Sequence, residues 1–121
     1  MSNLRSPNLR ARDINKLAMY KLQSIVWDAG CDETSEWVFA STEDARHKEG
    51  LLKWLGSKNI DPSCEVVRVN SLSAEIERIV WSDILKAPEL YFSGKEFKIY
   101  DVDLAWVLEY APQEIARFGR V

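Results

Sequence analysis

The side chains that could support catalysis in this chain are few and widely spaced. The sole histidine, His47, follows Asp44 by three residues, a spacing at which a carboxylate could orient an imidazole base on one helix face. Asp101 and Asp103 form an Asp-x-Asp motif, and paired carboxylates after a strand can hold a divalent cation, as in nucleotide-sugar enzymes. One hypothesis is therefore a small metal-dependent hydrolase or transferase that uses Asp101, Asp103 and His47.

A simpler interpretation of the same residues is structural. Aspartate tolerates turn geometry and suits no buried strand, so the Asp-x-Asp motif favours a β-turn. No nucleophile-elbow motif accompanies His47, which we expect on a helix surface, and the five isolated glycines form neither a GxGxxG nor a Walker phosphate loop. We therefore expect no catalytic residue, no metal ligand and no cofactor, and hence no enzyme.

The two cysteines and the apolar segments bear on the compartment. Cys31 and Cys64 are 33 positions apart, which is neither a Cys-x-x-Cys pair nor a disulfide framework. No segment approaches about 18 consecutive apolar residues, and no apolar stretch of a secretory signal follows the first arginines. We expect a cytoplasmic protein with reduced thiols and no membrane span.

Charge is unevenly distributed along the chain. Residues 1–21 carry a net charge of +4 and residues 22–121 a net charge of −7. We expect residues 1–12, which lack periodicity, to form a flexible basic leader ahead of a single globular domain over 13–121. An acidic domain repels phosphate backbones and suits solubility or a basic protein partner, so a nucleic-acid accessory role, the second alternative, would depend on the leader alone.

Apolar periodicity predicts the elements of this domain. Thirteen aromatic residues, five of them Trp, give the chain enough apolar surface for a core. The spacing predicts helices over 13–30, 41–55, 71–86 and 112–119, and strands over 36–40, 64–69, 89–92 and twice within 96–110. Because about 15 residues exceed an ordinary strand, a turn at 101–103 must divide that last run. The predicted fold class is α/β (α+β), in the order α-β-α-β-α-β-β-β-α, with a mixed five-stranded sheet whose first three strands can pair in parallel.

Five side chains are candidates for partner contact. Trp27 and Trp81 fall one step off the apolar stripes of their predicted helices, and exposed Trp side chains are frequent interface anchors. Strict alternation in the last run predicts one face with Tyr100, Val102, Leu104, Trp106, Leu108 and Tyr110. The opposite face then holds Asp101, Asp103, Ala105, Val107 and Glu109, which would form an acidic rim around small apolar residues unless a helix covers them.

The segments 89–92, 97–101 and 104–110 resemble the terminal strands of small bacterial immunity proteins from polymorphic-toxin systems, which end in a strand, a short acidic turn and a Trp-bearing strand. Trp106 and Asp101 match that pattern, whereas the chain continues with Ala111 and Pro112 in place of a longer polar tail. The resemblance implies a non-enzymatic protein that neutralises a cognate toxin by binding it. We therefore expect a binding protein with a protein partner, plausibly a basic toxin domain.

Overall fold

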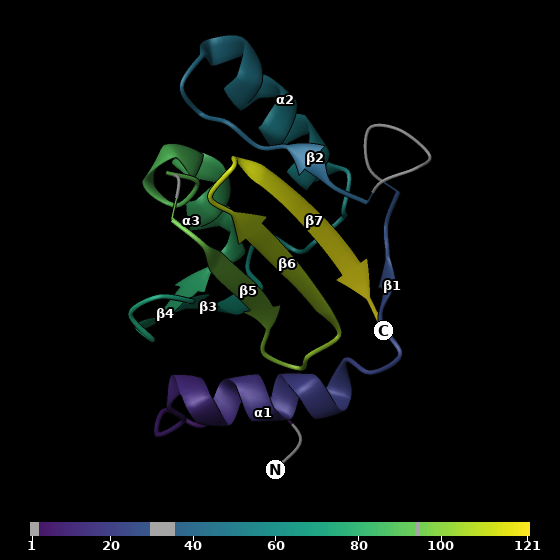
Figure 1. The fold of residues 1–121 in the computed structure, drawn as a ribbon, viewed down its shortest axis with the longest axis vertical. Coiled ribbons are helices and arrows are strands. Elements are labelled where there is room, and N and C mark those ends of the chain that lie inside the picture. The colour runs from purple at the N-terminus through teal and green to yellow at the C-terminus, as the bar shows by residue number, and fades with distance from the viewer. Residues whose placement is uncertain (1–2, 30–35, 94) are drawn as a thin grey trace.

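Helices lie on both faces of one curved antiparallel sheet (Figure 1). The computed structural model describes residues 3–29, 36–93 and 95–121. In chain order the elements are α1 (Ala11–Lys21), β1 (Val26–Trp27), β2 (Val38–Phe39), α2 (Ala45–Gly56), β3 (Glu65–Asn70), β4 (Ile76–Val80), α3 (Trp81–Lys86), the 3₁₀ helix η1 (Pro88–Leu90), β5 (Phe97–Asp101), β6 (Trp106–Ala111) and β7 (Ile115–Arg120).

The sheet differs from the mixed five-stranded sheet that the sequence predicts. Among the described residues seven strands take part, in the order β1-β7-β6-β5-β3-β4, and β2 also pairs with β7. Every pairing recorded among the described residues is antiparallel. The expected parallel pairing needed helical crossovers, whereas short turns join β3 to β4, β5 to β6 and β6 to β7, and antiparallel strands need no more than that. The coarser expectation, a fold that mixes helices with a sheet, is confirmed.

The largest correction lies at residues 71–86, where the spacing predicts one helix and the structure has a turn, β4 and the short α3. The Asn70 carboxamide oxygen accepts a hydrogen bond from the Leu72 N–H at 3.0 Å, and Ala74 has a φ of 59°. This turn reverses the chain, so that β4 runs antiparallel to β3. The β-branched side chains of β4 therefore pair with residues of β3 across the two strands. Apolar residues at mixed spacing therefore serve a strand first and a helix only from Trp81 onward.

The C-terminal segment is a strand, although Pro112 and Gly119 predict a final helix. The Glu114 N–H donates to the Ala111 oxygen at 3.0 Å, and Glu114 has a φ of 63°, which closes a tight turn after β6. β7 then pairs with β6 along its whole length. The predicted helix is wrong because the hairpin gives the backbone groups of this segment partners in the sheet.

The remaining differences are smaller. Residues 89–92 predict a strand, but η1 occupies the first two of them. The strand predicted at the sheet centre over 36–40 is the two-residue β2 at an edge, with Phe39 exposed. The first helix ends at Lys21, so residues 26 and 27 belong to β1; its predicted stop, Gly30, lies outside the described residues. The helix over 41–55, the strand over 64–69 and the turn after β5 are confirmed, with ends shifted by a few residues.

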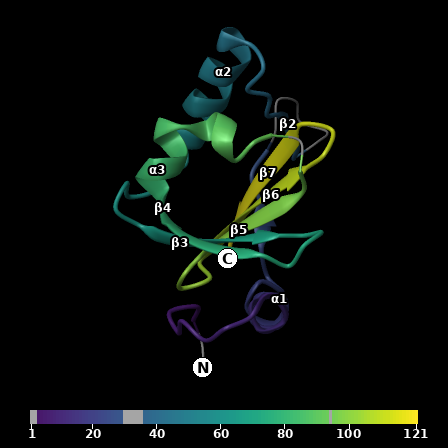
Figure 2. The ribbon, with the colours of Figure 1, turned by 90° about the vertical axis from the view of Figure 1, so that its left-hand side faces the viewer.

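The sheet has a hydrophobic core on each face (Figure 2). On the face covered by α2, α3 and η1, here called the α2 face, the core includes Leu55, Trp81, Phe97, Trp106 and Phe118. On the face covered by α1, here called the α1 face, it includes Leu4, Ile14, Val67, Tyr100 and Val107. Two helices and η1 cover the first face and a single helix the second, so the two faces are unequally covered.

Residues 4–6 pack on the sheet, within the segment whose lack of periodicity predicts a flexible leader. Leu4 is fully buried, and its N–H donates to the Val102 oxygen at 2.7 Å. The Arg78 guanidinium of β4 donates to the oxygens of Leu4 and Ser6, both at 2.6 Å. Burial of the Leu4 side chain and these bonds hold the segment in place.

Candidate functional site

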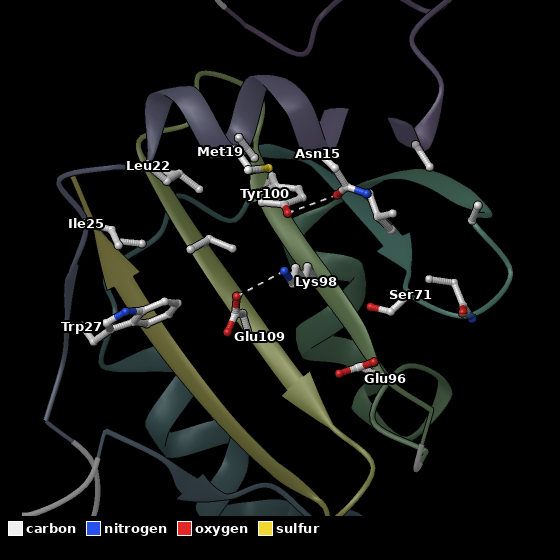
Figure 3. Close-up of a pocket in the computed structure, with 16 residues that line it drawn as sticks. Asn15, Met19, Leu22, Ile25, Trp27, Ser71, Glu96, Lys98, Tyr100 and Glu109 are labelled. Carbon is white, nitrogen blue, oxygen red and sulfur yellow. Dashed lines mark hydrogen bonds and ion pairs between the residues drawn. The ribbon is translucent and has the colours of Figure 1, made fainter. Parts of the chain in front are cut away.

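α1 covers only part of its face of the sheet, and a groove of about 510 Å³ lies beside it (Figure 3). Side chains of β3, β5 and β6 form the floor, α1 and the residues leading into β1 form one wall, and the turn between β3 and β4 closes the far end. We call this feature the sheet-face groove. The lining residues that matter below are Asn15, Met19, Trp27, Lys98, Tyr100 and Glu109.

Polar groups of the groove are tied to one another. The Lys98 ammonium lies 3.5 Å from a Glu109 carboxylate oxygen, and the Tyr100 hydroxyl donates to the Asn15 carboxamide oxygen at 3.4 Å. Burial of the phenol, assisted by the nearby Glu109 carboxylate, raises the pKa of Tyr100 to about 12. The groove floor therefore offers a neutral hydroxyl and a paired ammonium at neutral pH.

Arg117 of β7 connects the groove to two indoles. Its guanidinium carbon lies 3.7 Å from the ring centroid of Trp27 and 4.8 Å from that of Trp37. Nε donates to one Glu109 carboxylate oxygen at 2.8 Å, Nη2 lies 2.7 Å from the same oxygen as an ion pair, and Nη1 pairs with Glu36. We call Arg117, Trp27 and Trp37 the Arg117 stack. Two rings and two carboxylates fix this guanidinium in one geometry.

Gly119 allows the Trp27 ring to lie over β7. The two residues are register partners between β1 and β7, and a Cβ built on Gly119 would lie 2.9 Å from Trp27 Cε3 and 2.9 Å from Ile25 Cδ1. Real Cβ atoms do not approach other heavy atoms so closely, so only glycine fits without displacement of these side chains.

The structure brings together two of the five predicted contact residues, Trp27 and Glu109, on the same guanidinium. Trp81 is fully buried instead, as the first residue of α3, and its ring meets that of Trp106 edge-on at 5.5 Å. The prediction of a partner contact at Trp81 is therefore wrong, because the start of α3 directs this side chain into the α2-face core.

The predicted acidic rim is not assembled, because its carboxylates lie apart. Asp101 is buried at the end of β5, where its side chain accepts from the Ala105 N–H at 3.3 Å and lies 3.5 Å from the Cys64 sulfur. Asp103 is exposed in the following turn and pairs with Arg5 at 3.0 Å. Of the three carboxylates of the predicted rim, only that of Glu109 lines the sheet-face groove.

Cys64 is a free thiol held in its neutral form. Burial, with the Asp101 carboxylate as the next contribution, raises the pKa of Cys64 to about 11. Such a thiol is a poor nucleophile at neutral pH. The other predicted thiol, Cys31, lies outside the described residues.

The predicted alternation from residue 100 to residue 110 breaks at the turn between β5 and β6. Tyr100 faces α1, whereas Trp106, Leu108 and Tyr110 belong to the core beneath α2 and α3. Leu104, at a φ of 55°, ends a turn that changes the phase of the side chains. Val107 consequently lies in the α1-face core, where Leu22, Ile25 and Trp27 also pack.

The three residues of the metal-enzyme hypothesis are not neighbours. His47 is exposed on α2, where its ring meets that of Phe39 edge-on at 4.9 Å. α2 lies at one end of the molecule and the turn with Asp101 and Asp103 at the other (Figures 1 and 2). Within residues 3–29, 36–93 and 95–121, no group of three or more His, Cys, Asp or Glu side chains is placed to hold a metal ion.

Two of the three arginines in the predicted leader are paired with carboxylates. Arg5 binds Asp103, and Arg10 lies 3.5 Å from Asp13. Arg12, which lies in α1, and Lys16 one turn later make no ion pair with a described residue, and both are exposed. Fewer basic side chains are therefore available to bind a nucleic acid than the number of arginines and lysines in residues 1–21 indicates.

Arg117 and Lys98 are the functional candidates that the sequence interpretation misses. Arg117 falls in the segment predicted as a helix, although Ile115, Arg117 and Gly119 alternate with the buried Ala116 and Phe118. That period of two is a strand signal and would place Arg117 on the face opposite the core. Lys98 alternates in the same way within β5.

Comparison of the chain with protein families, with curated proteins and with solved structures gave no match. No helix among the described residues is long and apolar enough to cross a membrane.

Proposed function

We propose that this chain is a non-enzymatic protein that binds and regulates a protein partner through the α1 face of its sheet. The observation that carries the proposal is the Arg117 stack beside the sheet-face groove: Trp27 and Trp37 both pack on the Arg117 guanidinium, and Trp27 also lines the groove together with Tyr100. Trp, Tyr and Arg are the residues that most often dominate the free energy of protein–protein binding.

The geometry of the Arg117 stack favours binding because its side chains are already held in one conformation before a partner binds. Nε and Nη1 of Arg117 already donate to Glu109 and Glu36, and the Trp27 ring packs on Arg117 and over Gly119. A partner that covers these side chains immobilises few rotamers, so more of the contact energy appears as affinity.

The resemblance of residues 89–110 to immunity proteins makes a toxin domain encoded by the neighbouring gene the first partner to test. The chain carries a net charge of −3, which would speed encounter with a basic domain. Association that slows as ionic strength rises from about 0.05 to 0.5 M is the expected kinetic sign of this attraction.

The test is binding of that purified domain by calorimetry, together with rescue of growth when both genes are expressed. Trp37→Ala, which removes one ring of the stack, should weaken binding about 30-fold or more and abolish rescue. Leu90→Ala is the matched control, since Leu90 is exposed on η1 at the α2 face. Unchanged affinity in Trp37→Ala, or no binding by the wild-type chain, would contradict the proposal.

A further inference from the structure

We infer that a second copy of this chain occupies the sheet-face groove, with α1 of each copy seated in the groove of the other. The inference goes beyond the proposed function, because it concerns the purified chain alone. It rests on the unequal covering of the two faces, on exposed apolar side chains of α1, and on unpaired charges on either side of the groove.

The groove is the vacant half of a helix layer. α2, α3 and η1 pack on one face of the sheet, whereas the other face is covered by α1 and by the preceding segment that contains Leu4 (Figure 2). Figure 3 shows the groove extending alongside α1, with the sheet as its floor. Two copies that face each other about a two-fold axis would place both α1 helices side by side in one layer between the two sheets, in a contact where each copy uses the same patch.

α1 presents apolar side chains to solvent where that layer would form. Met19 is 78% exposed and lies at the lip of the groove, and the adjacent Tyr20 is 74% exposed. No described residue covers either side chain. A second α1 beside the first would remove Met19 from water, and Met adapts readily to an irregular contact.

Opposite charges without ion-pair partners among the described residues lie on α1 beside the groove and at the groove's far end. Arg12 and Lys16 extend from α1 without an ion pair among the described residues. Glu96 lines the end of the groove away from α1 (Figure 3) and likewise has no such pair. When α1 of one copy enters the groove of the other, these basic side chains approach the partner copy's acidic end. The chain is thus complementary in charge to itself on this face.

The dimer and the proposed complex use one face of the sheet, so they exclude each other. A partner that binds the Arg117 stack would compete with the second copy for the groove. Addition of such a partner would then convert the dimer into complexes that contain one copy of this chain.

Sedimentation equilibrium of the purified wild-type chain tests the inference. The expected mass at about 100 μM is twice the chain mass of 13.9 kDa, with a fall toward one chain mass on dilution. Met19→Glu should raise the dissociation constant about tenfold or more, because it buries a carboxylate beside the groove. Leu90→Glu is the control, since Leu90 is similarly exposed, at 70%, on the opposite face.

A charge exchange tests the register of the contact. Lys16→Glu and Glu96→Lys should each weaken the dimer several-fold, and the double variant should recover most of the loss. A single chain mass at every concentration would overturn the inference, as would a dimer equally sensitive to Leu90→Glu and Met19→Glu. Because no other protein is present, these outcomes are independent of whether the toxin domain binds.

Discussion

The guanidinium of Arg117 lies 3.7 Å from the centroid of the Trp27 ring, and the two residues come from adjacent strands at opposite ends of the chain. β7 lies between β1 and β6, so Trp27, Arg117 and Glu109 project from the same face of three neighbouring strands. Arginine stacks on indole and binds carboxylate through its fork at the same time. One side chain thereby fixes both residues that the sequence singles out at this site.

Arg117→Lys tests whether the fork and the stacking, rather than charge alone, hold this arrangement. Lysine keeps the positive charge but cannot stack as a plane or reach Glu109 and Glu36 from separate nitrogens, so we expect the free energy of unfolding to fall by about 1–2 kcal/mol. Urea denaturation followed by Trp fluorescence measures the change. Arg12→Lys, at an exposed position without an ion pair, should have no measurable effect. Equal stability of the two variants would show that the stack contributes nothing.

Gly119→Ala should disturb the packing of Trp27, a member of the Arg117 stack, on β7. The new methyl group would lie 2.9 Å from Trp27 and from Ile25, and we expect a loss of about 1–3 kcal/mol through overpacking. Gly50→Ala is the matched control, because no heavy atom lies within 4 Å of a Cβ there and alanine favours the interior of α2.

Chemical denaturation should therefore show opposite signs for the two alanine substitutions. Gly50→Ala is expected to raise the free energy of unfolding by up to about 1 kcal/mol. A Gly119→Ala protein with wild-type stability and an unchanged Trp emission spectrum would mean that Trp27 and Ile25 leave room for a methyl group.

The sequence best predicts the elements whose ends carry a capping or turn-forming residue. The helix predicted from Ser41 begins three residues later, after Asp44, which caps α2 by accepting from the Arg46 N–H at 2.7 Å; aspartates mark the turn after β5 as predicted. The segments of β4 and β7 were wrongly predicted as helices, because apolar residues at mixed spacing fit either a helix or a strand until the strand pairing is known. The positive φ values of Ala74 and Glu114, which close the two hairpins, have no recognisable sequence signal.

The candidate site was only partly predictable from the sequence, because its contacts also depend on strand pairing. Trp27 and Glu109 were identifiable as residue types suited to contact, but their common partner, Arg117, depends on strand order and register across β7. Trp81 and Asp101 were misplaced because a single phase error in a strand or helix moves a side chain to the other face. Long-range pairing, not residue chemistry, determines which candidates meet.

Trp81 and Trp106 should be the tryptophans whose truncation most destabilises the fold. The Trp81 side chain is fully buried and that of Trp106 nearly so, and their rings meet edge-on. Each change to Ala should cost about 3–5 kcal/mol by leaving a cavity, and a double-mutant cycle should give a coupling of about 0.5–1.5 kcal/mol. Where Ala unfolds the chain, Leu at each position removes the ring while leaving a smaller cavity, and the cycle is measured with these variants. A loss below about 1 kcal/mol for Trp106→Ala would contradict its burial.

Stability should fall in alkaline solution because Tyr100 resists ionisation. Burial raises the pKa of Tyr100 from 10.0 to about 12, so the unfolded chain loses the phenolic proton at lower pH than the folded chain does. The stabilisation is complete below pH 10 and is lost as pH rises from 10 toward 12. Two pKa units correspond to at most about 2–3 kcal/mol.

Tyr100→Phe isolates this contribution from other groups that titrate in the same range. The variant loses only the 3.4 Å bond to Asn15 at neutral pH, so its stability there should lie within about 1 kcal/mol of wild type. Between pH 10 and 12 the difference should shrink and then reverse in favour of phenylalanine, as measured by urea denaturation at each pH. Tyr20→Phe, at an exposed position, should follow the wild-type curve throughout. Parallel curves for wild type and Tyr100→Phe would mean that the Tyr100 phenol ionises as freely in the folded groove as in water.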